Sequence, residues 1–459
     1  MILTFEEARK ATEAHVEHAE RAPAEVIVST DTRTLQPGQT YLALRGERFN
    51  GHRYVGEALR QGAAALVIDE EPPQPVAVST LIVRDTLRAY LDLARAARAK
   101  FRGQVIAITG STGKTTTKTF LARLLSSKFG DAVVAAPANE NNEVGVGRLL
   151  LEVRPETRAL VVEMGARHYR DVEVLVDAAR PQVGVLTNIG EAHLEIFGSR
   201  ERLIETKWGL FSGGARAVLS VHDETSVSRA PSLTQPPIWF GLGDPAASGR
   251  SPVDGGAFLI DRQTLGIVRD GKSERFPTHA RIPGDYNLLN LAAALAAALD
   301  VGCAPSTLAQ IVPQLELPPG RYERVKVRSS VCVVYDAYNA SLTGTMATLD
   351  AFAQEPASRR IAVLGSMAEL GDEAESMHER VGAHAAARRI DIVLAGGEYA
   401  QALSHGALAA GATPPEVIPF ASNAEALKWL ETNLHPGDAV LIKGSRKYAM
   451  EQILDGLRA

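Results

Sequence analysis

The sequence predicts an α/β protein of three domains, the second and third built on mostly parallel sheets. Three observations lead to this prediction. The chain has 459 residues, and a globular domain commonly holds about 150. Apolar, β-branched runs alternate with helical patterns over most of its length, as expected when helices connect parallel strands. The composition, 45% hydrophobic and 22% charged, is that of a packed protein and excludes a disordered chain or a coiled-coil rod.

Residues 1–84 are predicted to form a small α/β domain. Its strand-like runs lie at 25–28, 41–44, 65–68 and 79–83. Pro37-Gly38 and the glycine-containing segment 46–51 are expected to be turns between these runs. We place the domain boundary close after the last run, at residue 84.

Residues 85–317 are predicted to form a central domain. Its clearest strands are continuous apolar runs, typical of strands buried on both faces, at 104–109, 159–163 and 182–188. Residues 222–280 interrupt the pattern with Pro, Gly and Ser, so we expect an irregular or antiparallel excursion there. Segment 288–299 is predicted to be a buried, Ala-rich helix, because its 12 residues are too few for a membrane span, which needs about 20.

Residues 318–459 are predicted to form a Rossmann-like, doubly wound domain. The predicted strands lie at 331–335, 361–365, 392–396 and 439–443. A helical stretch follows each strand, at 343–353, 374–387, 398–410 and 448–457.

Charge and cysteine content exclude several classes of partner. Lys and Arg number 49 and Asp and Glu 54, giving a net charge of −5, so no basic excess predicts binding to nucleic acid or to an anionic membrane. Cys303 and Cys332 are too few for a disulfide framework and are expected to be small core residues. The N-terminus lacks the pattern of a signal peptide. We therefore expect a cytoplasmic protein without a membrane span.

The strongest functional signal is a phosphate-binding loop. An apolar strand leads into Gly110-Ser111-Thr112-Gly113-Lys114-Thr115, and a helix is predicted to begin near Thr115. Backbone N–H groups of such a loop surround a phosphate, the helix N-terminus adds partial positive charge, and the Thr115 hydroxyl can bind magnesium. Lys114 adds a full positive charge. The loop is shorter than the standard motif, because Ile108 stands where the first glycine would be.

Two further strands supply groups that a nucleotide site needs. Glu163 ends the run 159–163, at the sheet edge where nucleotides bind in α/β proteins, and carboxylate oxygens suit magnesium. The next strand leads into segment 187–193, and we expect His193 near the metal or the phosphates. Lys207 lies 14 residues further on, and its spacing alone indicates an ordinary surface lysine of a helix.

These features, in this order, resemble the Mur ligase family, the ATP-dependent amide-forming enzymes of peptidoglycan assembly. Segments similar to this family occur over nearly the whole chain, at 31–33, 37–38, 46–52, 62–63, 139–145, 192–199, 284–290, 336–340, 364–371 and 443–451. They are most similar to the members that add D-alanyl-D-alanine to UDP-N-acetylmuramoyl-tripeptide. The Asp-Asn-Pro-Arg signature of the sister ligase that selects diaminopimelate is absent where Asp336 to Ala340 stands.

The resemblance implies an activity and a division of labour. ATP would phosphorylate the peptide carboxylate, and the amine of D-alanyl-D-alanine would attack the acyl phosphate to give UDP-MurNAc-pentapeptide, ADP and phosphate. Residues 1–84 would bind the UDP-MurNAc-peptide, residues 85–317 ATP, and residues 318–459 the incoming amino component. The resemblance also implies two Mg²⁺ ions, a carbamoylated Lys207 and a monomeric enzyme that serves cell-wall synthesis, cell shape and cell division.

The resemblance assigns roles position by position. Catalysis would fall to Lys114, His193 and Lys207. The metal ligands would be Thr115, Glu163, His193 and Lys207. The residues in contact with ATP would be Gly110, Ser111, Thr112, Gly113, Lys114, Thr115, Thr116, Asn287, Arg321 and Asp336. The residues in contact with the other substrates would be Thr32, Arg33, Gly46, Asn50, His52, Asn141, Asn142, Asn339, Lys443 and Ser445.

Several positions depart from the family pattern. Tyr286 stands where a histidine usually precedes the asparagine, Ser366 replaces an aspartate, and Ser341 replaces a proline-containing continuation. None of these changes removes a phosphate or metal group, so ATP chemistry is expected to be intact. The specificity for the amino component stays open, as does the third residue of the tripeptide, which could be lysine, diaminopimelate or ornithine.

Three other functions fit parts of the sequence. A ligase of the same fold could act on folate, cyanophycin or another muramyl peptide, but segments 31–33 and 46–52 favour a UDP-muramyl substrate. A kinase or ATPase without ligation would leave Lys207 and the third domain unexplained. A non-catalytic scaffold would be favoured only if Glu163, His193 or Lys207 were replaced, and all three are present.

Overall fold

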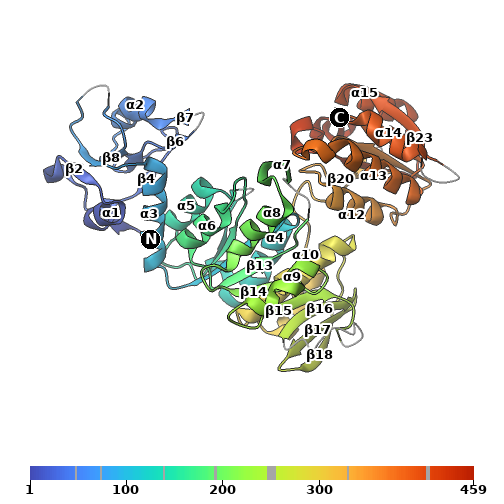
Figure 1. The fold of residues 1–459 in the computed structure, drawn as a ribbon, viewed down its shortest axis with the longest axis horizontal. Helices are drawn as coiled ribbons and strands as arrows, with labels where there is room; N and C mark the ends of the chain where they lie inside the picture. The colour runs from blue at the N-terminus through green and yellow to red at the C-terminus, as the bar shows by residue number, and fades with distance from the viewer. Residues whose placement is uncertain are drawn as a thin grey trace.

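The computed structural model describes residues 1–46, 49–72, 75–137, 140–190, 194–245, 255–327, 330–409 and 414–458. Three sheets, of five, nine and six strands, dominate this part of the chain. Figure 1 shows them one after another, with the N-terminal and C-terminal groups at opposite ends of the central group. Each sheet contains parallel strands joined through helices, which confirms the predicted α/β class.

The N-terminal sheet has the order β2-β9-β8-β5-β4. Only β2 runs antiparallel to its neighbour. The strands are β2 (His15–Glu17), β4 (Val28–Ser29), β5 (Thr40–Leu42), β8 (Ala65–Ile68) and β9 (Ser79–Ile82). The same part of the chain contains helices α1 (Phe5–Thr12) and α2 (Val55–Arg60). It also contains two short two-stranded sheets: β1 (Leu3–Thr4) pairs with β3 (Glu25–Val26), and β6 (Arg45–Gly46) pairs with β7 (Phe49–Asn50).

The predicted single strand at 25–28 is wrong in detail. Val26 pairs with Leu3 in β1, whereas Val28 pairs with Thr40 in β5. Ile27 between them is exposed, because the chain passes from one sheet to the other at this residue.

Helix α3 (Thr86–Lys100) belongs to two hydrophobic cores. Asp85 caps its first turn by accepting a hydrogen bond from the Arg88 N–H. Ala89 and Leu93 pack with the N-terminal sheet, and Ala94 packs with the central sheet. Apolar residues on two faces of one helix therefore connect the N-terminal and central groups.

The central sheet has the order β11-β12-β10-β13-β14-β15-β16-β17-β18. Neighbouring strands from β11 to β16 are parallel, and β16, β17 and β18 are joined antiparallel. The strands are β10 (Gln104–Thr109), β11 (Val133–Ala135), β12 (Ala159–Glu163), β13 (Val183–Leu186), β14 (Arg216–Ser220), β15 (Ile238–Leu242), β16 (Gly255–Asp261), β17 (Thr264–Arg269) and β18 (Lys272–Pro277).

The excursion predicted at 222–280 is only partly antiparallel. β15 and β16 extend the parallel sheet, and the antiparallel part is confined to β17 and β18. Pro231, Pro236 and Pro237 lie before β15 rather than within it. The strand itself buries Phe240. It is a short core strand that the sequence pattern did not reveal, because Pro- and Ser-rich connections flank it.

Helices cover both faces of the central sheet, as in a doubly wound fold. α4 (Lys114–Phe129), α10 (Asp285–Asp300) and α11 (Pro305–Ile311) share one core. α3, α5 (Glu143–Leu151), α6 (Asp171–Ala179) and α8 (Arg200–Trp208) contribute to the other. The predicted Ala-rich helix is confirmed, since α10 is buried along most of its length. Among the described residues, no helix is both long and apolar enough to span a bilayer.

Smaller elements connect these helices and strands. They are α7 (Leu194–Phe197), α9 (Glu224–Arg229) and the 3₁₀ turns η1 (Ala19–Arg21), η2 (Gly51–Tyr54), η3 (Gly130–Ala132), η4 (Gly209–Phe211), η5 (Ala230–Ser232), η6 (Val312–Gln314), η7 (Gly371–Glu373) and η8 (Arg446–Tyr448).

The C-terminal sheet has the order β19-β20-β24-β21-β22-β23. Only β19 is antiparallel. The strands are β19 (Glu323–Val327), β20 (Val331–Tyr335), β21 (Arg359–Leu364), β22 (Ile392–Gly396), β23 (Glu416–Phe420) and β24 (Asp438–Lys443). All four predicted strands are present, while β19 and β23, which carry charged or exposed residues, were not predicted.

Two layers of helices enclose the C-terminal sheet. α12 (Leu342–Phe352), α13 (Ala374–Ala387) and α14 (Ala400–Ala409) pack on one face. α15 (Asn423–Asn433) and α16 (Glu451–Arg458) pack on the other. The helix α15 was not predicted, but the four predicted helices are present within a few residues.

Phe120 tests how far the fold depends on the packing of α4. Its ring is fully buried in the core that α4 shares with α10, so Phe120→Ala is expected to lower the free energy of unfolding by about 3–5 kcal/mol. Leu408 is 55% exposed, and Leu408→Ala is expected to change it by less than about 0.5 kcal/mol. Urea unfolding of both variants checks the difference, and equal losses would contradict this description of the core.

Candidate active site

A tight loop joins β10 to α4 at the carboxyl edge of the central sheet. Gly110 and Gly113 have φ values of +148° and +81°, in the region that favours glycine. A Cβ atom at Gly113 would lie 2.1 Å from Asn290 Oδ1, and one at Gly110 would lie 1.9 Å from Thr187 Oγ1. Both glycines are therefore required by backbone conformation and by close approach of neighbouring side chains.

The end of β13 holds this loop in place. Asn188 Oδ1 accepts a hydrogen bond from the Thr112 N–H at 3.1 Å, and Thr187 Oγ1 donates to the Thr112 carbonyl at 2.6 Å. The Gly190 N–H donates to Ser111 Oγ at 2.9 Å. The loop thus stands fixed at the positive end of the 16-residue helix α4, an arrangement suited to binding an anion.

Glu163 is a buried carboxylate beside the loop. Its side chain accepts hydrogen bonds from Thr115 Oγ1 at 3.1 Å and from Asn141 Nδ2 at 3.0 Å, and it pairs with Lys118 Nζ at 3.0 Å. Burial raises the pKa of Glu163, but the cations of Lys118 and Lys114 and the Asn141 hydrogen bond outweigh burial and hold that pKa below its usual value. The group is therefore a charged carboxylate at neutral pH.

Two lysines, the buried Lys207 and the partly buried Lys114, converge on one carbonyl group. Lys114 Nζ donates to the Gly110 carbonyl oxygen at 2.8 Å, and Lys207 Nζ donates to the same oxygen at 3.2 Å. Burial lowers the pKa of Lys114, only partly offset by Glu163. Burial, with the neighbouring Lys114 cation, lowers the pKa of Lys207 well below its usual value. Among the described residues, no carboxylate forms an ion pair with Lys207, so nothing there offsets this shift toward the neutral amine.

The first turn of α10 forms another wall. Asn287 is buried, and its Nδ2 donates to the Pro283 carbonyl at 3.1 Å. Asn290, one turn later, faces Gly113 of the loop. The hydroxyl of Tyr286 is buried without a hydrogen-bond partner. The helix therefore presents amide groups next to the phosphate loop.

Residues just before β19 and just after β20 of the C-terminal sheet complete the site. Asp336 accepts a hydrogen bond from Thr348 Oγ1 at 2.6 Å and pairs with Lys443 Nζ at 3.2 Å. The Arg321 guanidinium lies 4.1 Å from the centroid of the Tyr338 ring. Both Asp336 and Arg321 line the same cavity as the phosphate loop, a cavity of about 580 Å³.

Most of the residues predicted to contact ATP, metal or the amino component meet in this cavity. Its predicted lining residues are Ser111, Thr112, Gly113, Lys114, Thr115, Thr116, Asn141, Glu163, Lys207, Asn287, Arg321, Asp336, Asn339 and Lys443. Gly110 lies beside them through its carbonyl group. His193 lies outside the described residues.

Two predicted contact residues do other work in this structure. Asn142 Oδ1 caps α5 by accepting a hydrogen bond from the Gly145 N–H at 3.0 Å. Ser445 is buried, and its hydroxyl accepts a hydrogen bond from the Ala368 N–H at 3.0 Å. Neither side chain lines the cavity.

The predicted N-terminal contacts form a separate group. Thr32 and Arg33 line a cavity of about 470 Å³, and Arg33 pairs with Asp31 at 2.6 Å. Gly46 lies in the exposed strand β6. Asn50 Oδ1 accepts a hydrogen bond from the His52 N–H at 2.9 Å, which begins the turn η2.

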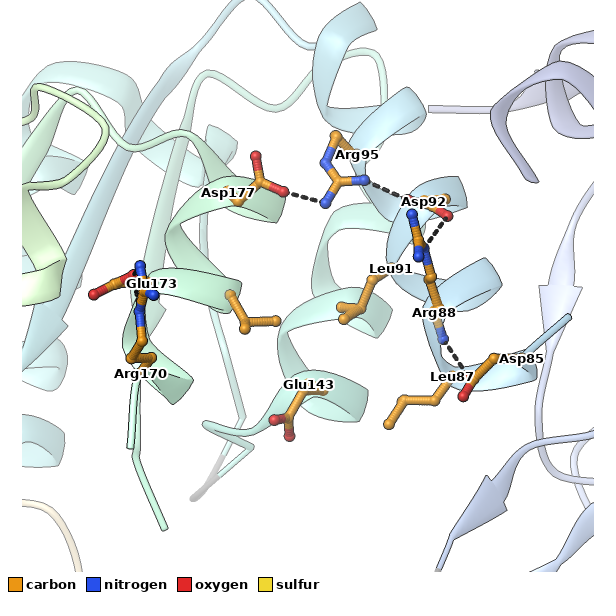
Figure 2. A pocket seen from close by; sticks show the side chains of 11 residues that line it. Asp85, Leu87, Arg88, Leu91, Asp92, Arg95, Glu143, Arg170, Glu173 and Asp177 are labelled. Atoms are coloured by element: carbon orange, nitrogen blue, oxygen red, sulfur yellow. Dashed lines mark hydrogen bonds and ion pairs between the residues drawn. The ribbon is translucent and has the colours of Figure 1, made fainter. Parts of the chain in front are cut away.

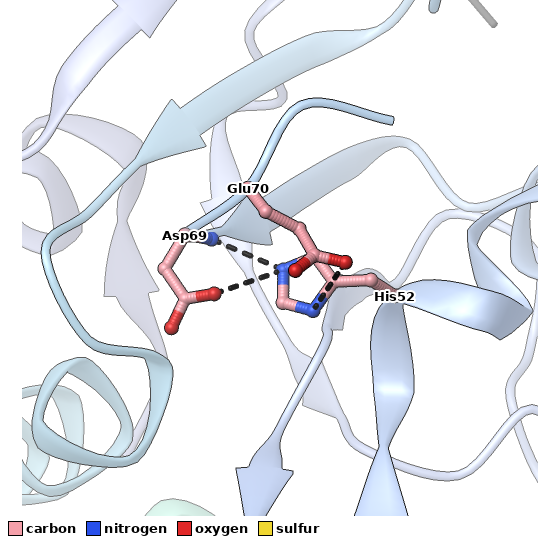
Figure 3. Close-up of side chains that lie close together, drawn as sticks. All are labelled: His52, Asp69 and Glu70. Carbon is pink, nitrogen blue, oxygen red and sulfur yellow. Dashed lines mark hydrogen bonds and ion pairs between the residues drawn. The ribbon is translucent and has the colours of Figure 1, made fainter. Parts of the chain in front are cut away.

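His52, Asp69 and Glu70 are the one cluster of three potential metal ligands among the described residues. Figure 3 shows the imidazole of His52 directed at Asp69 and close to Glu70. However, His52 Nε2 accepts a hydrogen bond from the Asp69 N–H at 3.1 Å. Arg45 pairs with both carboxylates, at 2.7 and 2.6 Å. These contacts describe a structural network that ties η2 to the end of β8.

A wider cavity, of about 680 Å³, lies between α3, α5 and α6. Figure 2 shows its charged side chains largely paired with one another: Arg95 contacts both Asp92 and Asp177, and Arg170 contacts Glu173. None of the residues predicted for catalysis lines it. We therefore place the candidate active site in the smaller cavity at the phosphate loop.

Sequence reasoning missed three residues of the site. Lys118 pairs with Glu163, Asn290 faces Gly113, and Tyr338 stacks against Arg321. Lys118 lies one helical turn after Lys114, and Asn290 one turn after Asn287, so helical spacing could have identified these two. Nothing local to Tyr338 indicates its position.

Comparisons with known proteins agree with this geometry. The sequence matches the family descriptions "Mur ligase family, catalytic domain" at residues 26–108, "Mur ligase middle domain" at 108–298 and "Mur ligase, glutamate ligase domain" at 320–446. A UDP-N-acetylmuramoyl-tripeptide–D-alanyl-D-alanine ligase of Synechocystis is 36% identical over 94% of this chain and 92% of its own.

Solved structures show the same fold. A crystal structure of MurF from Acinetobacter baumannii superposes with a TM-score of 0.87 at 28% identity, over 100% of this chain and 99% of that one. A MurF ligase from Thermotoga maritima in complex with ADP superposes with a TM-score of 0.78 at 28% identity, over 94% of this chain and 96% of that one.

Gly113 tests the geometry of the loop. Gly113→Ala is expected to weaken nucleotide binding roughly tenfold or more, because the new Cβ must displace Asn290 or the loop itself. Gly271→Ala is the matched control, since Gly271 has a similar φ of +71° with nothing within 4 Å of the added atom. Fluorescence titration with an ADP analogue measures both affinities. An unchanged affinity in Gly113→Ala would contradict the described packing.

Proposed function

The chain belongs to the Mur ligase family, and we propose that it is an ATP-dependent ligase that joins D-alanyl-D-alanine to UDP-N-acetylmuramoyl-tripeptide. The products are UDP-MurNAc-pentapeptide, ADP and phosphate. The observation that carries this proposal is the single cavity in which the phosphate loop, Glu163 and Lys207 meet Arg321 and Asp336 from the C-terminal group. The named relatives support the choice of substrates.

The reaction joins two steps that this cavity can serve. A carboxylate oxygen of the peptide attacks the γ-phosphorus of ATP, and the bond to ADP breaks, leaving an acyl phosphate. The dipeptide amine then attacks the acyl carbon, loses a proton, and phosphate leaves as the amide forms. An acyl phosphate hydrolyses readily in water, so exclusion of water from the cavity is part of the catalysis.

Positive charge in the cavity makes the first step possible. Carboxylate and triphosphate repel each other, and groups already in place must neutralise them. The loop N–H groups and the N-terminus of α4 would hold the phosphates, and Lys114 would neutralise the γ-phosphate once its contact with the Gly110 carbonyl is exchanged. Arg321 would add a second cation from the other side of the cavity.

The donor set beside the loop fits magnesium. Thr115 Oγ1 and a charged Glu163 oxygen lie 3.1 Å apart, and hydroxyl and carboxylate oxygens are ligands that Mg²⁺ prefers. Lys118 already pairs with Glu163 and would remain as a neighbouring cation. Thr115, Glu163 and His193 would hold Mg²⁺, which when bound neutralises phosphate charge and polarises the transferred phosphoryl group.

Lys207 fits the modification implied by the resemblance. A neutral amine adds to CO₂ to give a carbamate and a proton, whereas an ammonium does not react. Burial and Lys114 favour the neutral amine of Lys207. The carbamate would replace a buried amine, now hydrogen-bonded to the Gly110 carbonyl, with an anion next to Lys114, and it could serve as a metal ligand.

The proposal extends to the division of the chain. Residues 1–84 would bind the UDP-MurNAc-peptide, with Thr32, Arg33 and Asn50 near it. Residues 85–317 would bind ATP, and residues 318–459 would bind the dipeptide. Segment 317–320 would be the hinge on which the last part closes over ATP. The enzyme would act as a cytoplasmic monomer, and through its product it would support cell-wall growth, cell shape and division.

Phosphate release tests the proposed reaction. With ATP, Mg²⁺, D-Ala-D-Ala and UDP-MurNAc-tripeptides carrying lysine, diaminopimelate or ornithine, release is expected only when every component is present, with a pentapeptide product by mass spectrometry. Lys114→Ala is expected to lower the rate at least about 100-fold. Lys10→Ala, at an exposed lysine of α1, is the control. Release without the dipeptide, or full activity in Lys114→Ala, would contradict the proposal.

Carbamoylation of Lys207 has its own test. In ¹³C-bicarbonate, the wild-type protein is expected to show a carbamate NMR signal that is absent from Lys207→Met, which keeps a similar side-chain volume. Ligation is expected to fall in CO₂-free buffer and to recover when bicarbonate is added. Full activity without CO₂, together with no carbamate signal, would rule the modification out.

A further inference from the structure

The connections that leave neighbouring strands diverge at the carboxyl edge of the C-terminal sheet. β24 lies between β20 and β21. The helices that follow β20 and β21 pack on one face, whereas α16, which follows β24, packs on the other. Ligands of open α/β sheets bind where the connections diverge in this way. If the proposed function holds, this edge of the sheet is where the dipeptide amine approaches the acyl phosphate.

The loop of residues 365–371 follows β21 at this edge and contacts the residues at the end of β24. The Gly365 N–H donates to the Lys443 carbonyl at 2.7 Å, and the Ala368 N–H donates to Ser445 Oγ at 3.0 Å. Glu369 adopts a φ of +64°, which costs energy for a residue with a side chain. The loop is therefore held in a defined shape, and the surrounding contacts must maintain it.

His378 of α13 supplies one of those contacts. Its ring is fully buried, and Nε2 accepts a hydrogen bond from the Met367 N–H at 2.8 Å. Nδ1 lies 2.5 Å from the Ala374 carbonyl oxygen and donates to it. This second bond fixes the tautomer, so the lone pair of Nε2 faces the loop. Burial lowers the pKa of His378, which keeps the ring neutral.

Ser366 and Tyr399 complete a clamp around the same loop. Ser366 Oγ donates to the Gly396 carbonyl at 3.2 Å and accepts a hydrogen bond from the Tyr399 N–H at 3.0 Å. The Tyr399 ring stacks on His378, with centroids 4.6 Å apart and an interplanar angle of 21°. Two consecutive loop residues, Ser366 and Met367, are thus held by side-chain contacts from both directions.

We propose that His378 is a positioning residue for the amino component, acting through the Met367 backbone and supported by Ser366 and Tyr399. Neither ring nitrogen contacts the cavity residues of the phosphate loop, so His378 touches no ATP group. Its hydrogen bond instead holds the loop of residues 365–371, which contacts Lys443 and Ser445. Loss of that bond should weaken binding of the amine substrate and leave ATP binding unchanged.

Side-chain geometry provides a matched pair of variants. In His378→Gln, the amide oxygen can reach the place of Nε2 and accept from Met367. In His378→Asn, the shorter side chain reaches only the place of Nδ1. His384→Asn is the control on the same helix, because His384 pairs with Asp350 and, within the described part of the chain, forms no hydrogen bond with the loop. Ser366→Ala tests the clamp from its other end.

The experiment measures KM for D-Ala-D-Ala, for ATP and for the UDP-MurNAc-tripeptide, with kcat, in all four variants. His378→Asn is expected to raise KM for the dipeptide about tenfold, since an unpaired buried N–H is costly. KM for ATP is expected to stay within about twofold. His378→Gln should recover most of the loss, His384→Asn should resemble wild type, and Ser366→Ala should raise the dipeptide KM several-fold.

Two outcomes would overturn the proposal. One is an unchanged dipeptide KM in His378→Asn. The other is an equal rise in all three KM values that His378→Gln does not reverse. If His378→Asn does not fold, an unchanged dipeptide KM in Ser366→Ala decides against the proposal. A wild-type enzyme that ignores D-Ala-D-Ala but uses another amine would contradict the proposed function alone, and the same variants would then be measured with that amine.

Discussion

The site depends on two lysine side chains that converge on the Gly110 carbonyl with little negative charge to compensate them. Lys114 and Lys207 both donate to that oxygen, and the Glu163 carboxylate beside them already pairs with Lys118. Buried cations without full compensation are costly. Such a cavity is stabilised by an anion, and a polyphosphate meets that requirement. Burial and the neighbouring Lys114 cation also disfavour the ammonium form of Lys207, and the neutral amine is the form that reacts with CO₂.

The sheet explains why these groups meet. Parallel strands end at one edge, so β10 supplies the loop, β12 supplies Glu163, and β13 supplies Thr187 and Asn188. The N-terminus of α10 brings Asn287 to the same edge. The C-terminal group contributes Arg321 and Asp336 across the cavity, and Asp336 is itself held by Thr348 and Lys443. When the C-terminal group closes this cavity, the same movement would bring Arg321 to the phosphates and exclude water from them.

The sequence was most informative where the functional residues are contiguous or follow directly from the position of one strand. The phosphate loop is contiguous, and Glu163 follows from the rule that nucleotides bind at strand ends, so both could be predicted directly. Lys207 could not, because spacing on a helix does not reveal burial, and only the family resemblance identified it. The hydrogen bond of His378 to Met367 depends on tertiary packing between residues on different elements. The role of Asn142 as the cap of α5 likewise becomes visible only in the structure, and its predicted substrate contact stays a prediction.

In the proposed mechanism, the peptide carboxylate takes the γ-phosphoryl group of ATP inside a cavity that excludes water. UDP-MurNAc-tripeptide labelled with ¹⁸O in the reacting carboxylate tests this step. During ligation, one labelled oxygen is expected to appear in the inorganic phosphate, because the bond between that oxygen and the acyl carbon breaks when the amine attacks. Pentapeptide formed with unlabelled phosphate would contradict the account, since ATP would then have been hydrolysed without activating the carboxylate.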